Sequence, residues 1–186
     1  MSTAMITEMA IVNAMKQLMK FKSFNNISIK DIINECGVSR KTFYYHFRDK
    51  YDVVNWLFKT DIVDSVLDST TLENWADGSL KLCQYIYNNK TFYTNAINVT
   101  GKNSFKEYLN TLTRLQVEKL TTQACRTRTV GEDDKEFMID FFYNAFVGIL
   151  ITWINSEMKD NPEVIVKRWK TLTDKSIENY VNVMAK

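Results

Sequence analysis

Seven side chains between residues 40 and 50 have the chemistry to contact a nucleic acid. Arg40 and Lys41 can donate to the acceptors of guanine, and the methyl group of Thr42 can touch the methyl group of thymine. Groups that suit phosphate oxygens follow, which are the hydroxyls, imidazole and ammonium of Tyr44, Tyr45, His46 and Lys50. This order predicts contacts to base edges first and contacts to the sugar–phosphate backbone after them.

Two short helices joined by a glycine turn would present these side chains. Ser28 begins the first helix in a pattern that resembles a capping box, with Asp31 in place of the usual Glu. Gly37 suits a turn that needs a positive φ, and Ser39 is a good N-cap for a helix over residues 40–47. The apolar residues that two crossed helices could share as a core are Ile29, Ile32, Ile33, Val38, Phe43 and Phe47. The pattern is that of a helix-turn-helix.

A helix-turn-helix directs the N-terminal residues of its second helix at base edges in the major groove, and a helix N-terminus attracts anions. We therefore expect the backbone N–H groups near Ser28 to receive a phosphate. The complete set of expected DNA contacts is Ser28, Ser39, Arg40, Lys41, Thr42, Tyr44, Tyr45, His46 and Lys50. Two alternatives stay open: one of the tyrosines packs inward, or His46 is a core or capping residue.

The charge of the chain is unevenly distributed. The formal net charge is +2 over all 186 residues. Residues 1–60 carry nine Lys/Arg and five Asp/Glu, a net charge of +4, which leaves −2 for the remainder. A basic N-terminal part indicates a polyanionic partner at that end.

The stretch from Ser28 to Lys50 resembles the DNA-binding domain of the TetR/AcrR family of transcriptional regulators. The matching features are Ser-Ile-x-x-Ile-x-x-x-Cys-Gly-Val-Ser, then Thr-Phe-Tyr-Tyr-His-Phe over residues 42–47, then Lys50. Cys36 stands where Ala is commoner in the family. The resemblance implies DNA contacts from residues 41–46 and from Lys50. It also implies an N-terminal three-helix, homeodomain-like bundle followed by a TetR-type helical C-terminal domain.

Three later segments resemble one branch of that family, which includes activators of dihydroxyacetone kinase genes. They are residues 51–56, 89–93 and 103–108. The resemblance implies control that works partly through a protein partner rather than through a deep ligand pocket.

The rest of the chain also favours helices, because it has a single Pro and few Gly to make tight turns. Apolar spacing and capping signals predict helices near residues 5–22, 49–67, 72–88, 91–99, 104–127, 133–158 and 162–184. We predict an all-α fold with a helix-turn-helix domain over residues 1–50 and a helical effector and dimerisation domain over residues 51–186.

One predicted helix is apolar on nearly every side. Residues 137–154 approach the length of a bilayer span, but Asp140, Asn144 and Thr152 interrupt them. We therefore expect burial in protein, without a membrane partner, and a second subunit to cover one face. The expected interface of this homodimer, a two-fold four-helix bundle that the resemblance also implies, comprises Phe141, Ala145, Gly148, Ile149, Thr152, Ile165, Trp169, Leu172 and Ile177.

Aromatic residues of the C-terminal part allow two interpretations. Tyr85, Phe92, Tyr108 and Phe142 could line a small-molecule effector pocket, or they could simply fill an aromatic-rich core. The second interpretation needs no ligand and is the one we favour.

Several function classes are disfavoured by what the sequence lacks. It contains no glycine-rich phosphate loop, nucleophile elbow or metal motif, so we predict no enzyme. Cys36, Cys83 and Cys125 form no CxxC pair or Cys/His cluster, so we expect no metal, cofactor or disulfide framework. The N-terminus has no secretory-signal pattern, and a reducing cytoplasm fits best.

Two functions remain for a helical protein of this kind. The first is a dimeric, sequence-specific regulator of transcription that binds a double-stranded, pseudo-palindromic operator and answers to a small-molecule or protein effector. The alternative is a helical protein-interaction module, a co-regulator that acts through a protein partner with little DNA binding of its own.

Overall fold

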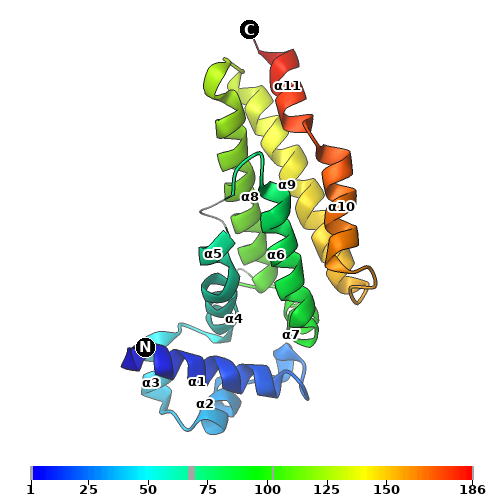
Figure 1. The fold of residues 1–186 in the computed structure, drawn as a ribbon. Helices are drawn as coiled ribbons and strands as arrows, with labels where there is room; N and C mark the ends of the chain where they lie inside the picture. The colour runs from blue at the N-terminus through cyan, green and yellow to red at the C-terminus, as the bar shows by residue number, and fades with distance from the viewer. Residues whose placement is uncertain (1, 67–69, 102, 186) are drawn as a thin grey trace. The chain divides into compact units, whose positions relative to one another are not determined.

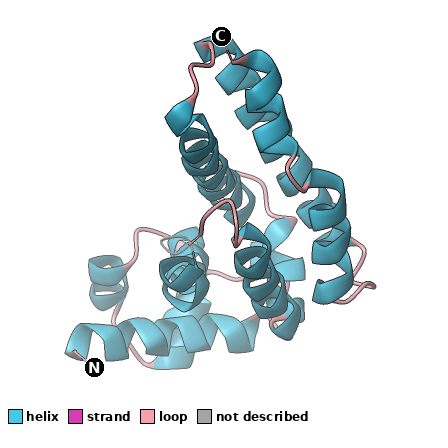
Figure 2. Ribbon diagram, turned by 45° about the horizontal axis from the view of Figure 1, so that its top comes forward, coloured by secondary structure: helices cyan, strands magenta, loops and turns pink. Residues whose placement is uncertain are grey.

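A computed structural model describes residues 2–66, 70–101 and 103–185 (Figure 1). Every regular element in these ranges is helical, and they contain no strand (Figure 2). In chain order the elements are α1 (Thr3–Leu18), η1 (Phe24–Asn26), α2 (Ile29–Cys36), α3 (Arg40–His46), α4 (Lys50–Phe58), η2 (Lys59–Val63), α5 (Asp64–Val66), α6 (Trp75–Asn88), α7 (Lys90–Ile97), α8 (Phe105–Ala124), η3 (Cys125–Thr127), α9 (Glu132–Asn155), α10 (Pro162–Thr173) and α11 (Ser176–Met184). The predicted all-α class is confirmed.

The packing divides the chain into two compact units. Unit 1 joins Met1–Val63 to Asn89–Tyr108, and unit 2 joins Asp64–Asn88 to Leu109–Lys186. Part of the predicted C-terminal domain therefore packs with the helix-turn-helix. The functional boundary at residue 50 stays a prediction.

The first three helices of unit 1 form the predicted three-helix bundle. α1 packs on α2, α3 and α4, and α2 packs on α3. Phe43 and Phe47 are buried, as the shared core of two crossed helices requires. α7 and the beginning of α8 add to this unit, because the ring of Phe58 lies 5.7 Å from Tyr93 and 5.0 Å from Phe105 between centroids.

Side-chain caps begin three helices of unit 1 where the sequence places them. Ser28, Ser39 and Asp49 each accept a hydrogen bond from the backbone N–H three residues further on, at 3.1, 3.0 and 2.8 Å. Gly37 ends α2 with a φ of 71°, in the left-handed region that favours glycine. The turn between α2 and α3 is therefore specified locally.

Two predicted helices are interrupted. The helix expected over residues 49–67 is α-helical to Phe58, continues as the π-helical turn η2 and becomes α-helical again in α5. Its expected last residue lies outside the described ranges. The helix expected over residues 162–184 is divided, because Lys175 between α10 and α11 has a φ of 59°. Apolar spacing continues across both interruptions, so the spacing alone could not reveal them.

Unit 2 contains the remaining long helices. α6 packs on α10, and α9 contacts α11. α8 lies beside α9, where Arg114 of α8 forms ion pairs with Glu136 and Asp140 of α9 (Figure 1). A core cluster of unit 2 consists of Val117, Val130, Met138, Ile139, Phe142 and Val181.

Within the described ranges, α9 is a helix long and apolar enough by length and composition to cross a membrane. Its most apolar window has a mean hydropathy of 1.7, and 39% of that window is buried in the chain. Met138, Phe142 and Leu150 face the protein, whereas Phe137 and Phe141 are exposed. One chain thus covers one face of α9 and leaves the other uncovered.

Candidate DNA interface

The N-terminus of α2 is closed by a reciprocal capping box. The hydroxyl of Ser28 accepts from the N–H of Asp31, and the carboxylate of Asp31 accepts from the N–H of Ser28 at 2.8 Å. Both of these backbone donors are therefore engaged. A phosphate at this helix end would have to use the N–H groups between them, those of Ile29 and Lys30, which have no intrahelical partner.

The charge of Asp31 is stabilised in place. Hydrogen bonds from the Ser28 hydroxyl and N–H, and then the nearby Lys22 ammonium at 3.3 Å, lower the pKa of the carboxyl from 3.8 to about 2. This side chain carries a negative charge beside the expected phosphate position. The electrostatic attraction of this helix end for DNA is reduced accordingly.

α3 has an outward and an inward face. Arg40, Lys41, Tyr44 and Tyr45 are all exposed, and these positions fall on one side of a helix. Tyr45 is 83% exposed and Tyr44 is 47% exposed, so neither tyrosine packs inward. The Arg40 guanidinium lies 5.6 Å from the centroid of the Tyr44 ring, which orients both side chains along this face.

The first turn of α3 is ordered by its cap. The hydroxyl oxygens of Ser39 and Thr42 lie 2.7 Å apart and share a hydrogen bond. Because the Thr42 hydroxyl has this internal partner, its methyl group is the part of the side chain that suits a thymine contact.

His46 points away from the outward face of α3. Its side chain is 8% exposed, and Nδ1 lies 3.4 Å from the Glu8 carboxylate of α1. The interpretation of His46 as a core residue, left open by the sequence, is the one that this geometry supports. The pair links the last turn of α3 to the helix behind it.

Lys50 is occupied by backbone carbonyls. Its ammonium donates to the carbonyl oxygens of Phe24 at 2.8 Å, Asn25 at 3.2 Å and Ile27 at 2.8 Å. Burial lowers the pKa of this ammonium from its usual value. All three N–H donors are used in this arrangement, so a phosphate contact would require one of these bonds to be exchanged.

Two asparagines of unit 1 support the site from outside residues 1–63. Asn95 of α7 bonds the segment between α1 and α2, and Asn103 donates to the Asp49 carboxylate at 3.1 Å. The backbone carbonyl oxygen of Asn103 also accepts a hydrogen bond from the side-chain amide of Asn55 at 3.1 Å. Sequence reasoning missed both residues, because their partners lie far away in the chain and no local pattern marks them.

The four residues predicted to line an effector pocket belong to different units. Phe92 and Tyr108 lie in unit 1, and Tyr85 and Phe142 lie in unit 2. Phe92, Tyr108 and Phe142 each contact another ring of their own unit, at centroid distances of 5.1, 6.4 and 6.2 Å. These contacts are those of a packed aromatic core, and the effector pocket stays a prediction.

A groove of about 520 Å³ lies elsewhere in unit 2, between the end of α8 and the beginning of α9. Glu118, Thr121, Lys135 and Glu136 are among its lining residues. None of the four predicted effector residues borders it.

The residues expected at the dimer interface differ in burial. Within one chain, those that are exposed are Phe141, Gly148, Ile149, Thr152 and Leu172. Ala145 and Ile177 are half-buried, and Ile165 and Trp169 lie in the interior of unit 2. The dimer interface stays a prediction.

Two family descriptions match this chain. Residues 11–56 match "Bacterial regulatory proteins, tetR family". Residues 73–175, more than half of the chain, match the TetR-type "Transcriptional regulator C-terminal region". The chain belongs to the TetR family. This TetR-family protein is a DNA-binding transcriptional regulator and not an enzyme, as the sequence predicted.

This TetR-family protein is similar to a curated relative and to two solved structures. It is 31% identical over 93 residues to the HTH-type dhaKLM operon transcriptional activator DhaS of Lactococcus lactis subsp. lactis (strain IL1403), a match over 50% of each chain. The chain thus spans about half the length of the curated relative it matches.

The solved structures show the same fold. The dihydroxyacetone kinase operon activator DhaS matches with a TM-score of 0.69 and 22% identity, over 98% of this chain and 99% of that chain. A TetR transcriptional regulator from Streptococcus agalactiae 2603V matches with a TM-score of 0.62 and 19% identity, over 91% and 94% of the two chains. The TetR-type fold that the sequence predicted is confirmed.

Proposed function

We propose that this TetR-family protein binds a pseudo-palindromic operator as a homodimer, through the outward face of α3. The observation that carries the proposal is the division of that helix. Its outward face presents two cations and two phenols, Arg40, Lys41, Tyr44 and Tyr45, whereas Phe43 is buried. Cations suit guanine acceptors and phosphates, and phenol hydroxyls suit phosphate oxygens.

The residue roles within this proposal follow the geometry. Arg40, Lys41 and the Thr42 methyl contact bases from the first turn of α3, with Ser39 as the cap that holds this turn. Tyr44 and Tyr45 contact phosphates. Ser28, His46 and Lys50 support the interface from behind, because each is engaged in an internal hydrogen bond or ion pair.

The homodimer is supported by the uncovered face of α9. Phe141 is 59% exposed, and Ala145, Gly148, Ile149 and Thr152 continue a stripe along the same helix. Small residues in this stripe allow two helices to approach closely, and burial of exposed aromatic surface favours association. Two α3 helices related by a two-fold axis then read two half-sites about one helical turn apart.

An effector that acts on unit 2 completes the proposal. The relative DhaS is named as an activator of the dhaKLM operon, and the solved DhaS structure as a dihydroxyacetone kinase operon activator; a regulator similar to it would control a dihydroxyacetone kinase operon. Three of the four aromatic residues of the predicted pocket, Phe92, Tyr108 and Phe142, have ring partners in their own units, which favours a protein effector over a small molecule. Action on DNA also implies a cytoplasmic location.

The test is an anisotropy titration with DNA from upstream of the protein's own gene. Lys41→Ala and Tyr44→Ala each remove one contact of the outward face and should weaken binding to this DNA by about tenfold or more. Lys167→Ala removes an exposed cation on α10 and should leave the Kd within about twofold of the wild type. Equal affinity of all four proteins for this DNA would contradict the proposal.

A further inference from the structure

The segment between α1 and α2 is held by a side chain that lies outside the helix-turn-helix. The side chain of Asn95 accepts from the N–H of Phe24 at 2.9 Å. Its amide nitrogen donates to the carbonyl oxygen of Lys22 at 3.1 Å and lies 3.4 Å from that of Met19. One side chain thus satisfies backbone groups at both ends of the turn that follows α1.

Lys50 holds the other side of the same segment. Its ammonium donates to the carbonyl oxygens of Phe24, Asn25 and Ile27, as described above. Asn95 and Lys50 therefore hold the segment from the two ends of Phe24, one at its N–H and one at its carbonyl. Backbone groups in an irregular segment need such partners, because no helix supplies them.

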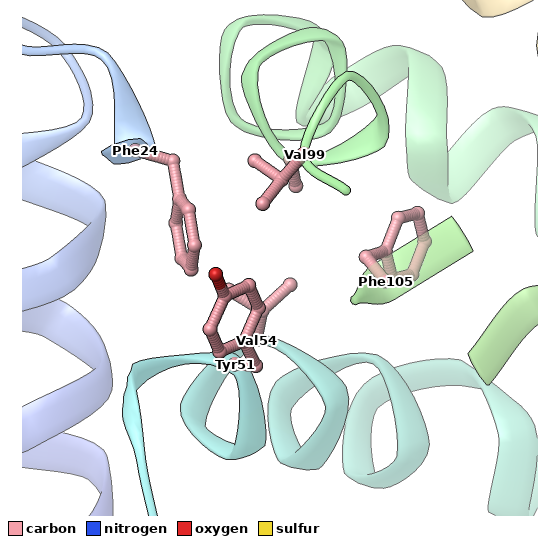
Figure 3. A pocket seen from close by; sticks show the side chains of 6 residues that line it. Phe24, Tyr51, Val54, Val99 and Phe105 are labelled. Carbon is pink, nitrogen blue, oxygen red and sulfur yellow. The ribbon is translucent and has the colours of Figure 1, made fainter. Parts of the chain in front are cut away.

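Asn95 lies next to a closely packed part of unit 1. Ala96, the next residue of α7, lines an apolar junction with Val99 and Phe105. Phe24, Tyr51 and Val54 face them across this junction (Figure 3). The junction leaves no room for a water molecule. A side chain anchored beside such close packing fixes the position of the backbone it binds.

The held segment leads directly to the DNA interface. Ile27 is buried one residue before Ser28, which caps α2, and α2 packs on α3. Any displacement of the segment therefore moves α2 and changes the support of α3.

We propose that Asn95 is a positioning residue for operator binding, which acts by holding the α1–α2 segment against α7. This inference rests on the proposed function, because it assumes that α3 reads the operator. The functional DNA-binding unit then includes α7 and is not complete within residues 1–63.

Two substitutions of Asn95 test the proposal. Asn95→Ala removes all three hydrogen bonds. Asn95→Asp keeps the shape and the acceptor for the Phe24 N–H, but it cannot donate to the Lys22 and Met19 carbonyls. Each variant should bind the operator about tenfold more weakly than the wild type. Asn95→Asp, which is isosteric, provides the test if Asn95→Ala fails to fold.

Asn98 supplies matched controls. It lies on the C-terminal side of α7 and is exposed, and its side chain bonds the Thr94 carbonyl of its own helix at 3.1 Å. Asn98→Ala and Asn98→Asp make the same chemical changes, including the same new charge, without touching the α1–α2 segment. Both should keep the operator affinity of the wild type within about twofold.

Two further measurements distinguish positioning from general destabilisation. Affinity for an unrelated duplex, which depends on charge rather than on register, should stay unchanged in Asn95→Ala. Amide hydrogen exchange at Phe24 should become faster in Asn95→Ala and not in Asn98→Ala. Operator affinity that stays at the wild-type value, or an equal loss for both duplexes, would overturn the inference. A wild-type protein that shows no preference for the operator would instead refute the proposed function.

Discussion

Single residues of unit 1 show that a side chain with the chemistry to bind DNA can instead bind groups of its own chain. Lys50 has the charge to bind a phosphate, yet its three donors meet three carbonyl oxygens. His46 has the imidazole for the same task, yet it lies against Glu8. Residue type tells which groups each side chain can bind, but it does not tell the direction in which the side chain points. Tyr44 and Tyr45 are exposed, and their contacts with phosphates stay a prediction.

Asp31 provides a prediction at this scale. The unfolded carboxyl titrates near 3.8 and the folded one at about 2, because Ser28 and Lys22 stabilise the carboxylate. A lowered folded-state pKa stabilises the fold above pH 3.8, and this contribution is lost as the pH falls through 2. Ser28→Ala should return the pKa towards 3.8 by more than Lys22→Ala does, since the Ser28 hydrogen bonds are the larger cause.

The measurement is a carboxyl ¹³C NMR titration from neutral pH down to the onset of acid unfolding. Wild-type Asp31 should show no protonation step above pH 3, as a carboxyl with a pKa of about 2 requires. A step near 3.8, or a larger effect of Lys22→Ala, would contradict the capping geometry.

At the scale of elements, helix ends lie where the sequence predicts them when a capping side chain or a glycine marks the position. Ser28, Gly37 and Ser39 specify the two helices of the motif and the turn between them, and all three behave as predicted. The interruptions at η2 and at Lys175 carry no such signal. A lysine with a φ of 59° adopts a conformation that its type disfavours, so the residue type gives no warning of this break.

Gly37 provides the prediction at this scale. A Cβ at Gly37 would meet no atom within 4 Å, so the cost of a side chain comes from its φ of 71° alone. Gly37→Ala should lower the free energy of unfolding by about 1 kcal/mol. Gly37→Asn should cost less, because asparagine tolerates the left-handed region.

Urea unfolding, monitored by circular dichroism, gives the free energy of unfolding of both variants. If Gly37→Ala and Gly37→Asn were equally stable, the conformation of this turn would not be the cause of the loss.

At the scale of the whole molecule, α9 connects packing within the chain to the proposed assembly. Its inward face supplies the core of unit 2, including Phe142, and its outward face shows Phe141 and Gly148. Phe137, Phe141 and Ile149 are all exposed on this one helix, and exposed apolar residues that gather in this way suit a partner surface. A second copy of the chain is the partner that the proposed mechanism requires.

Gly148 provides the prediction at this scale. An added Cβ at Gly148 meets nothing within 4 Å in a single chain, so the fold of one chain tolerates a larger residue there. Gly148→Leu should weaken the dimer strongly and Gly148→Ala less, because leucine keeps two facing helices apart. Helix propensity should make both variants at least as stable as the wild type, by up to about 1 kcal/mol in the monomer.

Sedimentation equilibrium reports the dimer constant, and thermal unfolding at a dilution where the protein is monomeric reports the fold. Unchanged association in Gly148→Leu would place the interface on another surface.

The sequence by itself determined the helical class, the helix-turn-helix and the residue types on the exposed face of α3. These follow from periodicity, caps and a glycine turn, all of which act between neighbouring residues. The tertiary structure decided that α7 packs in unit 1 with the helix-turn-helix, that Asn95 holds the α1–α2 segment and that His46 and Lys50 turn inward. The contacts behind these outcomes join residues far apart in the chain, by 71 positions for Phe24 and Asn95, 38 for Glu8 and His46 and 26 for Phe24 and Lys50. No local pattern encodes contacts over such separations.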